Sequence, residues 1–326
     1  MKCHAIQADK TGGPEVLAWR EVEVGDPGPG EILVRHQAVG LNYIDTYQRS
    51  GLYPPATKPF TLGLEGAGVV EKLARDVTGL KAGDRIAYAS PPMGAYAQLR
   101  LMPADRVVKV PDGIDHDTAA AMMLKGMTAE YLLRRTYPVK KGDVILFHAA
   151  AGGVGLIACQ WAKAIGATVI GTVGTDQKAE LARAHGCDHP IVYTREDLVA
   201  RVKEITGGEG VAVVYDSVGK DTFERSLDCL SPRGLLALFG QSSGPVGPFD
   251  PAVLAAKGSL YLTRPSLMVY NAKRADLEAS AAALFDMVGS GKVKIEINNR
   301  YPLAKAAQAH RDLEGRKTTG STIFEP

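Results

Sequence analysis

A chain of 326 residues, 45% of them hydrophobic, is long enough to bury a large core and is expected to divide into two domains. Its 38 basic and 36 acidic residues leave a formal net charge of only +2, which argues against nucleic acid or a membrane as the main partner. No apolar run approaches the ~20 residues that span a bilayer, and the first residues lack the regions of a signal peptide, so a cytoplasmic protein is expected.

Residues 1 to about 123 are interrupted by Gly and Pro every few positions. Short apolar runs at 31–35, 68–71 and 85–88 lie between these turn signals, which predicts a compact, largely antiparallel β domain. Polar and aromatic residues gather at 40–55 and 62–68. Taken alone, the first cluster is more typical of a packed turn with surface tyrosines than of a site.

From about residue 118 the pattern becomes helical, with predicted helices at 119–123 and 128–137. A buried strand at 143–147, a glycine turn, and a helix to residue 165 follow. Apolar residues recur along that helix at the spacing of one face, so Trp161 is predicted to be core.

Alternating strands and helices continue beyond this helix. The strands are predicted at 168–173, 190–193, 211–215, 235–239 and 259–263, and the helices at 176–185, 196–205 and 221–230. Strands this apolar must be covered on both faces, which predicts a doubly wound parallel sheet.

The tail after Arg264 departs from this alternation. Its predicted elements are helices near 274–288 and 304–313 and strands at 292–297 and 321–324, which are expected to fold back onto the first domain. The four cysteines are scattered singly, so they are predicted to be reduced thiols in or near the core: Cys3, Cys159, Cys187 and Cys229.

The turn at 150–155 indicates a dinucleotide site. It departs from G-x-G-x-x-G because Ala150 stands first, and a tight structural turn is the alternative. The context favours the site, since a strand precedes the turn, a helix follows it, and a second strand ends about 20 residues later. The residues expected to meet the pyrophosphate are Gly152, Gly153, Val154 and Gly155.

The end of the second strand bears on the choice of cofactor. An NAD site needs an acid there for the ribose 2′-hydroxyl, whereas Gly174 and Thr175 leave room for a 2′-phosphate that Lys178 can neutralise. Asp176 points the other way, although at the start of a helix it can interact with the dipole instead. These residues favour NADPH over NADH.

Longer runs carry a family resemblance. The runs are 40–47, 49–55, 124–128, 147–163, 214–219 and 258–266. They resemble the zinc-free branch of the medium-chain dehydrogenase/reductase superfamily, and the chain is similar from end to end to the bacterial NADPH:quinone oxidoreductase family, relatives of zeta-crystallin. An alanine at the position of Ala150 is usual in that branch.

The resemblance implies an α/β architecture in three parts. A GroES-like, mostly antiparallel β catalytic domain would span residues 1–123, a Rossmann NADPH-binding domain 124–265, and a C-terminal segment returning to the catalytic domain 266–326. Zinc-dependent members carry Cys where this chain has Asn42 and a His-Glu pair where it has Leu64-Glu65. Because a catalytic zinc needs three protein ligands, no metal is expected.

The resemblance also implies site residues. It places Asn42 and Tyr53 at the nicotinamide and quinone end, with Asp45 and Tyr47 close behind; local turn bonding is the structural alternative for each. The implied cofactor-binding residues, besides Asn42, the glycine turn and Thr175, are Lys125, Thr128, Gly174, Lys178, Tyr193, Ser217, Val218, Phe239, Gly240, Gln241, Ser242, Arg264, Pro265, Ser266 and Arg316. Lys125 is equally compatible with a surface cation, and Ser217 and Val218 with packing.

The function implied is NADPH-dependent reduction of a quinone by hydride transfer. A quinone is electron-poor and its reduced form is aromatic, so positioning can suffice without a metal. Reduction of an enal or enone on the same scaffold is one alternative, and a non-enzymatic RNA-binding or crystallin-like protein is another. The resemblance further implies a homodimer through the sheet edge near Ser259–Thr263.

Overall fold

The computed structural model describes residues 1–326, which form two compact units. Unit 1 contains Met1–Met127, Asn271–Gly289 and Ile295–Pro326. Unit 2 contains Thr128–Tyr270 and Ser290–Lys294. The first boundary lies inside helix α2 (His116–Tyr131), so the chain passes from one unit to the other along a continuous helix. No helix in either unit is long and apolar enough to cross a membrane.

Unit 2 is built on a six-stranded parallel sheet. Its strands, in sheet order, are β11 (His189–Val192), β10 (Thr168–Val173), β9 (Val144–Phe147), β12 (Val211–Asp216), β13 (Leu230–Leu238) and β14 (Tyr261–Thr263). The chain fills one half of the sheet outward from β9 and then the other half outward from β12. This order is that of the doubly wound dinucleotide-binding fold, and the predicted fold class is confirmed.

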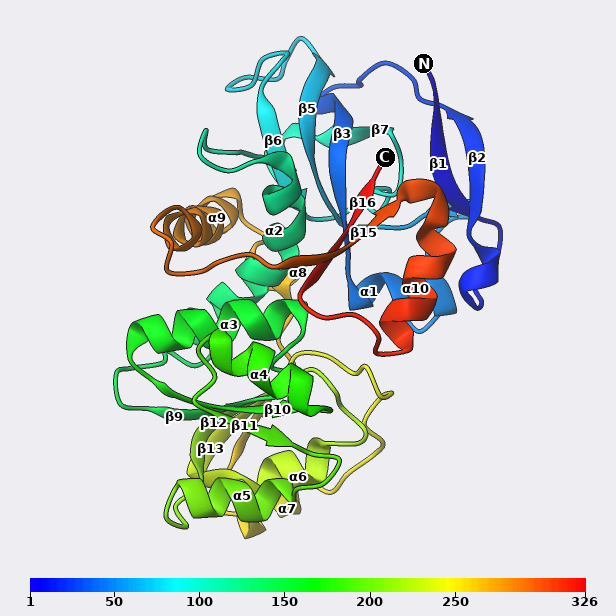
Figure 1. Ribbon diagram of the computed structural model, residues 1–326. Coiled ribbons are helices and arrows are strands. Elements are labelled where there is room, and N and C mark those ends of the chain that lie inside the picture. Colours follow the sequence, from blue (N-terminus) through cyan, green and yellow to red (C-terminus); the bar gives the residue numbers. More distant parts are fainter. The chain divides into compact units, whose positions relative to one another are not determined.

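Helices cover both faces of this sheet, as Figure 1 shows, with α3 and α4 on one face and α5, α6 and α7 on the other. Their bounds, with the short α8, are α3 (Gly153–Ile165), α4 (Asp176–Ala184), α5 (Leu198–Ile205), α6 (Phe223–Asp228), α7 (Ala252–Ala256) and α8 (Leu267–Tyr270). Because both faces are covered, Leu146, Ile170 and Val214 in the central strands are fully buried. Trp161 of α3 is also buried, as predicted.

Unit 1 is mostly antiparallel, as predicted, and its largest sheet has the order β15-β16-β3-β5-β6-β8, with β7 also paired to β3. These strands are β3 (Glu31–Leu41), β5 (Glu65–Leu73), β6 (Arg85–Ala89), β7 (Leu99–Pro103), β8 (Val108–Lys109), β15 (Ile297–Pro302) and β16 (Ser321–Glu325). A second sheet contains β1 (Lys2–Ala8), β2 (Ala18–Glu23) and β4 (Phe60–Thr61). The helices of unit 1, besides its part of α2, are α1 (Tyr43–Ser50), α9 (Arg274–Gly289) and α10 (Ala306–Glu314).

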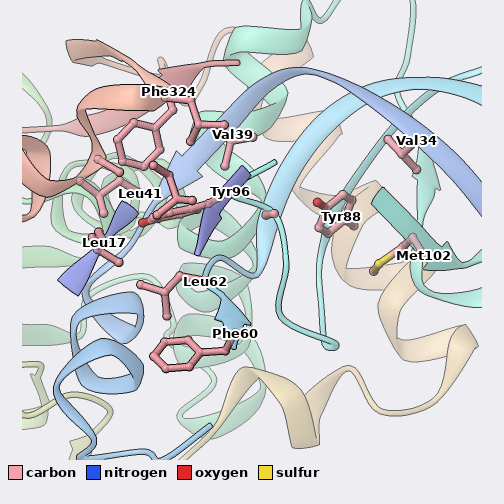
Figure 2. Close-up of a cluster of buried hydrophobic side chains, with 14 of the residues drawn as sticks. Leu17, Val34, Val39, Leu41, Phe60, Leu62, Tyr88, Tyr96, Met102 and Phe324 are labelled. Atoms are coloured by element: carbon pink, nitrogen blue, oxygen red, sulfur yellow. The ribbon is translucent and has the colours of Figure 1, made fainter. Parts of the chain in front are cut away.

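The core of unit 1 joins the N-terminal strands to the last strand of the chain. Figure 2 shows Tyr96 beside Leu41 and Phe324, and the rings of Tyr96 and Phe324 meet edge to face with centroids 4.8 Å apart. Because Phe324 of β16 is fully buried there, the C-terminal strand is part of this core.

Four predicted features differ from the structure, the first two for local backbone reasons and the other two because of tertiary contacts. The cluster at 40–55 contains helix α1 rather than a packed turn, since Asn42 caps it at one end and Gly51, in the left-handed region at φ 92°, ends it. The strand predicted from residue 259 begins only at Tyr261, because Gly258 and Ser259 have φ of 113° and 56°.

The strand predicted at 292–297 is wrong. The strand of this region is β15, which begins at Ile297, whereas residues 292–296 form no ladder. Lys294 instead exchanges two hydrogen bonds with the side chain of Gln160, whose Oε1 accepts from its backbone N at 2.9 Å and whose Nε2 donates to its carbonyl at 3.0 Å. A side chain of α3 thus replaces the neighbouring strand that the alternating pattern indicated.

The two helices predicted at 119–123 and 128–137 are one helix, α2, followed by a single π turn at Leu132–Thr136. Gly126 lies inside α2 without breaking it. A Cβ there would meet Cδ1 and Cδ2 of Leu284, on α9, at 2.4 and 2.6 Å. Gly126 therefore serves close helix packing rather than a chain break.

Gly126→Ala is expected to lower the free energy of unfolding by up to about 2 kcal/mol, because overpacking of about 1–3 kcal/mol is offset by the roughly 1 kcal/mol gained in helix propensity. Urea unfolding measures it. Gly289→Ala in α9, where no atom lies within 4 Å of the added Cβ, is the control and should not destabilise. A stabilised Gly126→Ala variant would show that Leu284 moves aside at no cost.

Candidate active site

The N-terminus of α1 positions the first group of predicted residues. Asn42 directly follows β3 and is the N-cap of α1, and its backbone N donates to Oδ2 of Asp45 at 2.9 Å. This bond satisfies one of the donors that a helix start leaves unpaired. It also fixes the point at which the Asn42 side chain leaves the sheet.

A buried carboxylate then orients that side chain. Asn42 Nδ2 donates to Oε2 of Glu65 at 2.7 Å, and the Lys125 ammonium donates to the same oxygen at 3.1 Å. The second oxygen, Oε1, accepts from the backbone N of Leu124 at 2.7 Å. Glu65 is completely buried and Lys125 is 6% exposed, so the two charges compensate each other away from water.

The close contact between β3 and the Glu65 carboxylate depends on Gly40, which has no Cβ. A Cβ at that position would lie 2.1 Å from Oε2 of Glu65 and 2.5 Å from the carbonyl oxygen of Ala120. No other residue fits between β3, β5 and α2 without displacing the carboxylate.

The hydrogen bonds leave a defined set of polar groups for a ligand. Because the amide nitrogen of Asn42 is bound to Glu65, its Oδ1 acceptor is directed elsewhere. The Lys125 ammonium has three donors, and its contact with Glu65 accounts for one of them. An acceptor beside a charged donor suits a carboxamide or a carbonyl compound.

Asp45 lies behind this group and is fully buried. Tyr96 donates its hydroxyl to Oδ2 of Asp45 at 2.9 Å, whereas Oδ1 is buried without a hydrogen-bond partner. Burial raises the pKa of Asp45 to about 7, against the lowering effect of the bonds from Asn42 and Tyr96. Asp45 is predicted among the catalytic residues, and its contacts also support the start of α1 beside Asn42.

The hydroxyl of Tyr96 continues to a buried histidine. His310 Nε2 lies 3.1 Å from it, and His310 Nδ1 lies 3.1 Å from Nη1 of Arg49. Burial lowers the pKa of His310 to about 3, so the ring is neutral. Arginine only donates, so Nδ1 accepts and Nε2 carries the proton that faces Tyr96. Arg49 also pairs with the partly exposed Glu314 at 2.7 Å.

The predicted residues Tyr47 and Tyr53, together with Tyr43, form a series of ring contacts that begins on α1 and ends beyond it. The ring centroids of Tyr43 and Tyr47 are 5.7 Å apart, and those of Tyr47 and Tyr53 are 5.4 Å apart in an edge-to-face arrangement. Tyr53 is 38% exposed. Its exposed ring is suited to packing against a flat aromatic ligand.

In unit 2 the glycine turn joins β9 to α3 and lies against β10. Ala150 is fully buried, its backbone N donates to the Thr172 carbonyl at 3.0 Å, and its Cβ would lie 2.6 Å from a Cβ at Gly171. At Gly155 a Cβ would meet the carbonyl oxygen of Ala149 at 2.4 Å. The turn therefore brings backbone N–H groups of the α3 N-terminus close to any bound anion.

A buried polar network ties the base of this turn to the next loop. His148 contacts the hydroxyls of Thr172 and Ser226, each at 3.0 Å, and Ser226 donates to Asp216 at 2.8 Å. Asp216 in turn accepts from the backbone N of Val218 at 2.7 Å. The glycine turn and the loop after β12 are thus held in one arrangement.

The loop after β10 contains the residues predicted to read the 2′ position. Thr175 caps α4 by accepting from the backbone N of Lys178 at 3.2 Å. A Cβ at Gly174 would lie 3.0 Å from the hydroxyl of Tyr193, which is 39% exposed. Arg195, which the sequence did not single out, forms a bidentate ion pair with Asp176.

The remaining predicted residues of unit 2 follow the ends of β12, β13 and β14. Ser242 N donates to the Ser217 carbonyl at 3.1 Å, and Arg264 donates to the Leu238 carbonyl at 2.8 Å. A Cβ at Gly240 would lie 2.6 Å from the Ser217 carbonyl oxygen. Parallel strands bring their carboxyl ends to one edge, which gathers these loops beside the glycine turn: 217–218, 239–242 and 264–266.

The structure separates the predicted site residues between the two units. Those in unit 1 are Asn42, Asp45, Tyr47, Tyr53, Lys125 and Arg316. Arg316 follows α10 and adopts φ 57°. Thr128 is buried in α2 at the first position of unit 2, whose other predicted residues lie in the loops at the carboxyl edge of the sheet.

The residues of unit 1 do not fit a metal ion. No group of three His, Cys, Asp or Glu side chains suited to one occurs in residues 1–326, although a catalytic zinc takes three protein ligands. Glu65 is already bonded to an ammonium, an amide and a backbone N–H.

Two protein families match successive parts of the chain. Residues 28–112 match the alcohol dehydrogenase GroES-like domain, and residues 153–292 match the zinc-binding dehydrogenase family.

Full-length relatives are similar in sequence and structure. The chain is 54% identical to a quinone oxidoreductase of Pseudomonas aeruginosa, covering 98% of this chain and 99% of that one. It is 47% identical to a 2-haloacrylate reductase of a Burkholderia species, covering 97% of each. A crystal structure of the Escherichia coli quinone oxidoreductase complexed with NADPH has a TM-score of 0.98 and 52% identity, covering 99% of this chain and all of the other.

Glu65→Gln is expected to lower the free energy of unfolding by about 3–5 kcal/mol, because the buried Lys125 ammonium loses its counter-charge. Adding Lys125→Met should restore part of this loss. The control is Glu21→Gln, which breaks the exposed pair with Lys2 and should cost about 1 kcal/mol or less. Chemical denaturation of the wild type and the three variants measures these effects. An equal, small effect of Glu65→Gln and Glu21→Gln would contradict a compensated buried charge.

Asp45→Asn is expected to change how stability depends on pH. The pKa of Asp45 in the folded chain, about 7, lies above the ordinary 3.8, so its favourable protonated form contributes fully below pH 3.8 and is lost as pH rises to about 7. The stability of the wild type relative to Asp45→Asn should therefore fall by about 1.4 kcal/mol per pH unit across this window. Urea unfolding at several pH values tests it, and parallel curves would refute the raised pKa.

Proposed function

This chain belongs to the quinone oxidoreductase family of the medium-chain dehydrogenases, and we propose that it reduces quinones with NADPH as hydride donor. The observation that carries the proposal is the dinucleotide cradle of unit 2. Its glycine turn, its loop after β10 and the loops after β12 to β14 all lie at one edge of a parallel sheet. The names of the full-length relatives supply the substrate class, and the complexed relative supplies the cofactor.

The residues of unit 2 fit the cofactor. The pyrophosphate would lie at the N-terminus of α3, where it would meet Gly152, Gly153, Val154 and Gly155. Only glycine fits at position 155, because a Cβ there would collide with the backbone of Ala149. Lys178 would pair with the 2′-phosphate, together with Thr175 and Tyr193. The loops at 217–218, 239–242 and 264–266 would line the two halves of the dinucleotide, with Thr128 near the nicotinamide end.

The residues of unit 1 would orient the reacting groups. Glu65 holds the Asn42 side chain through its amide nitrogen, so that Oδ1 would accept from a carboxamide, and holds Lys125 as a charged donor for an oxygen. Tyr53 and Tyr47 would pack against the flat acceptor, and Asp45 keeps the start of α1 in place. When bound, NADPH would supply a hydride to the quinone, and water would supply the one proton that completes the quinol.

This mechanism requires no metal. A quinone accepts a hydride readily because its reduced form is aromatic, so orientation provides most of what the protein must contribute. The Lys125 ammonium would stabilise negative charge on the acceptor oxygen as it develops.

We infer a homodimer that pairs the edge strand β14 of each subunit. This strand ends the sheet order, and its outer side has no partner strand within the chain. Tyr261 is 62% exposed on it. A second copy would cover an apolar edge that is otherwise prone to aggregation.

The four cysteines are buried and unpaired, which fits the reducing environment of the cytoplasm.

A second candidate is the reduction of an activated alkene, such as an enal or enone. The 47% identity to a 2-haloacrylate reductase favours it. The same Lys125 donor would stabilise the enolate oxygen that forms after hydride transfer to the β carbon.

A panel of acceptors tests the proposal. The wild-type chain with NADPH should lose absorbance at the nicotinamide band with 1,4-benzoquinone and with ortho-naphthoquinones, and turnover should be much slower with 2-alkenals and 2-haloacrylates. A metal chelator should leave the rate unchanged. Faster turnover of the alkenes would favour the second candidate. Binding of NADPH without turnover of any acceptor would favour a non-enzymatic protein.

A further inference from the structure

An ion pair stands at the cofactor end of β10. Nη1 and Nη2 of Arg195 donate to Oδ2 and Oδ1 of Asp176 at 2.6 and 2.5 Å, so both carboxylate oxygens are engaged. Asp176 is the first residue of α4, and Arg195 follows β11. The bond to Arg195 lowers the pKa of Asp176, which is therefore ionised at neutral pH.

The position of Asp176 connects this ion pair with the choice between NADH and NADPH. In doubly wound sheets an acid at the end of the second strand binds the ribose 2′-hydroxyl of NAD, whereas a nearby arginine accommodates the 2′-phosphate of NADP. Here the acid is present within three residues of the end of β10 at Val173. A free carboxylate there would repel a 2′-phosphate.

Other contacts hold the two loops together. Tyr193 N donates to the Val173 carbonyl at 3.1 Å, and Thr194 donates its hydroxyl to the Gly174 carbonyl at 3.2 Å. The loop after β11 is thus fixed beside the loop after β10 independently of the ion pair. Removal of Arg195 is therefore expected to change the local charge more than the local backbone.

We propose that Arg195 is a specificity-determining residue, which neutralises Asp176 and adds a positive charge so that this end of the site accepts NADPH in preference to NADH. The inference rests on the proposed NADPH-dependent function. The preference for NADPH over NADH would then depend on Arg195 and Asp176 as well as on Lys178. The carboxylate that would bind the 2′-hydroxyl of NADH is occupied by the arginine that favours the phosphate.

Stability alone does not account for the pair. The side chains of Arg195 and Asp176 are 58% and 66% exposed, and exposed ion pairs contribute little to folding. A purely structural role would therefore make substitutions nearly silent in nucleotide binding. A role in specificity would change the ratio of the NADPH and NADH affinities.

The test is calorimetric titration of NADPH and NADH into four proteins at low ionic strength: wild type, Arg195→Ala, Asp176→Asn, and the double variant. Arg195→Ala should weaken NADPH by about tenfold or more and leave NADH unchanged or tighter, because a charge is lost and a carboxylate is released. Asp176→Asn should leave NADPH within about threefold. The double variant should recover part of the NADPH affinity, since the released carboxylate is absent.

Arg201→Ala serves as the matched control, since this arginine forms partly exposed ion pairs with Glu196 and Glu204 and its removal should leave the ratio of the two affinities unchanged. An Arg195→Ala ratio within about twofold of wild type, or equal losses for both nucleotides, would overturn the proposal. If Arg195→Ala fails to fold, Asp176→Asn decides, because a tenfold loss of NADPH there would show that the carboxylate itself supports binding.

These results are separable from failure of the proposed function. A wild-type protein that binds neither nucleotide would remove the function and the inference together. A wild type that binds NADPH and reduces quinones, with an unchanged preference in Arg195→Ala, would remove the inference alone.

Discussion

The cofactor end of this protein depends on one constraint, the common direction of the six strands in unit 2. Because the strands are parallel, the chain must leave every one of them at the same edge, and the reversal of strand order between β9 and β12 opens that edge for a ligand. The glycine turn, the capped start of α4 and the loops after β12 to β14 are placed together by this geometry. The network from His148 to Asp216 then fixes two of them relative to each other.

A different interaction organises the predicted chemical end. Glu65 is a buried carboxylate whose oxygens are fully used by an amide, an ammonium and a backbone N–H. Breaking any of these bonds would leave a polar group unsatisfied in a region of low dielectric, so the arrangement is costly to change. Its effect is to give Asn42 one orientation and to keep a cation beside it. Asn42 and Lys125 thus provide a hydrogen-bond acceptor and a charged donor without a metal.

Ion pairing also determines the charge at the predicted adenosine end. Asp176 read alone argues for NADH, and Lys178 read alone argues for NADPH. The structure shows that Asp176 is bonded through both oxygens to Arg195, which lies 19 residues further along the chain. The net character of the site is therefore set by which charges meet, since an occupied carboxylate neither binds a hydroxyl nor repels a phosphate as a free one does.

The sequence by itself determined the elements whose periodicity is strong. The strand Thr168–Val173 and the helix after the glycine turn lie where the pattern predicts them, because a strand buried on both faces must be apolar throughout and a covering helix must be apolar on one side. The partners of polar residues came only from the tertiary structure. Gln160 replaces a strand at Lys294, Leu284 requires Gly126, and Arg195 neutralises Asp176. Hydrogen bonds and close contacts depend on distance in space, and residues far apart in the chain reveal that distance only after folding.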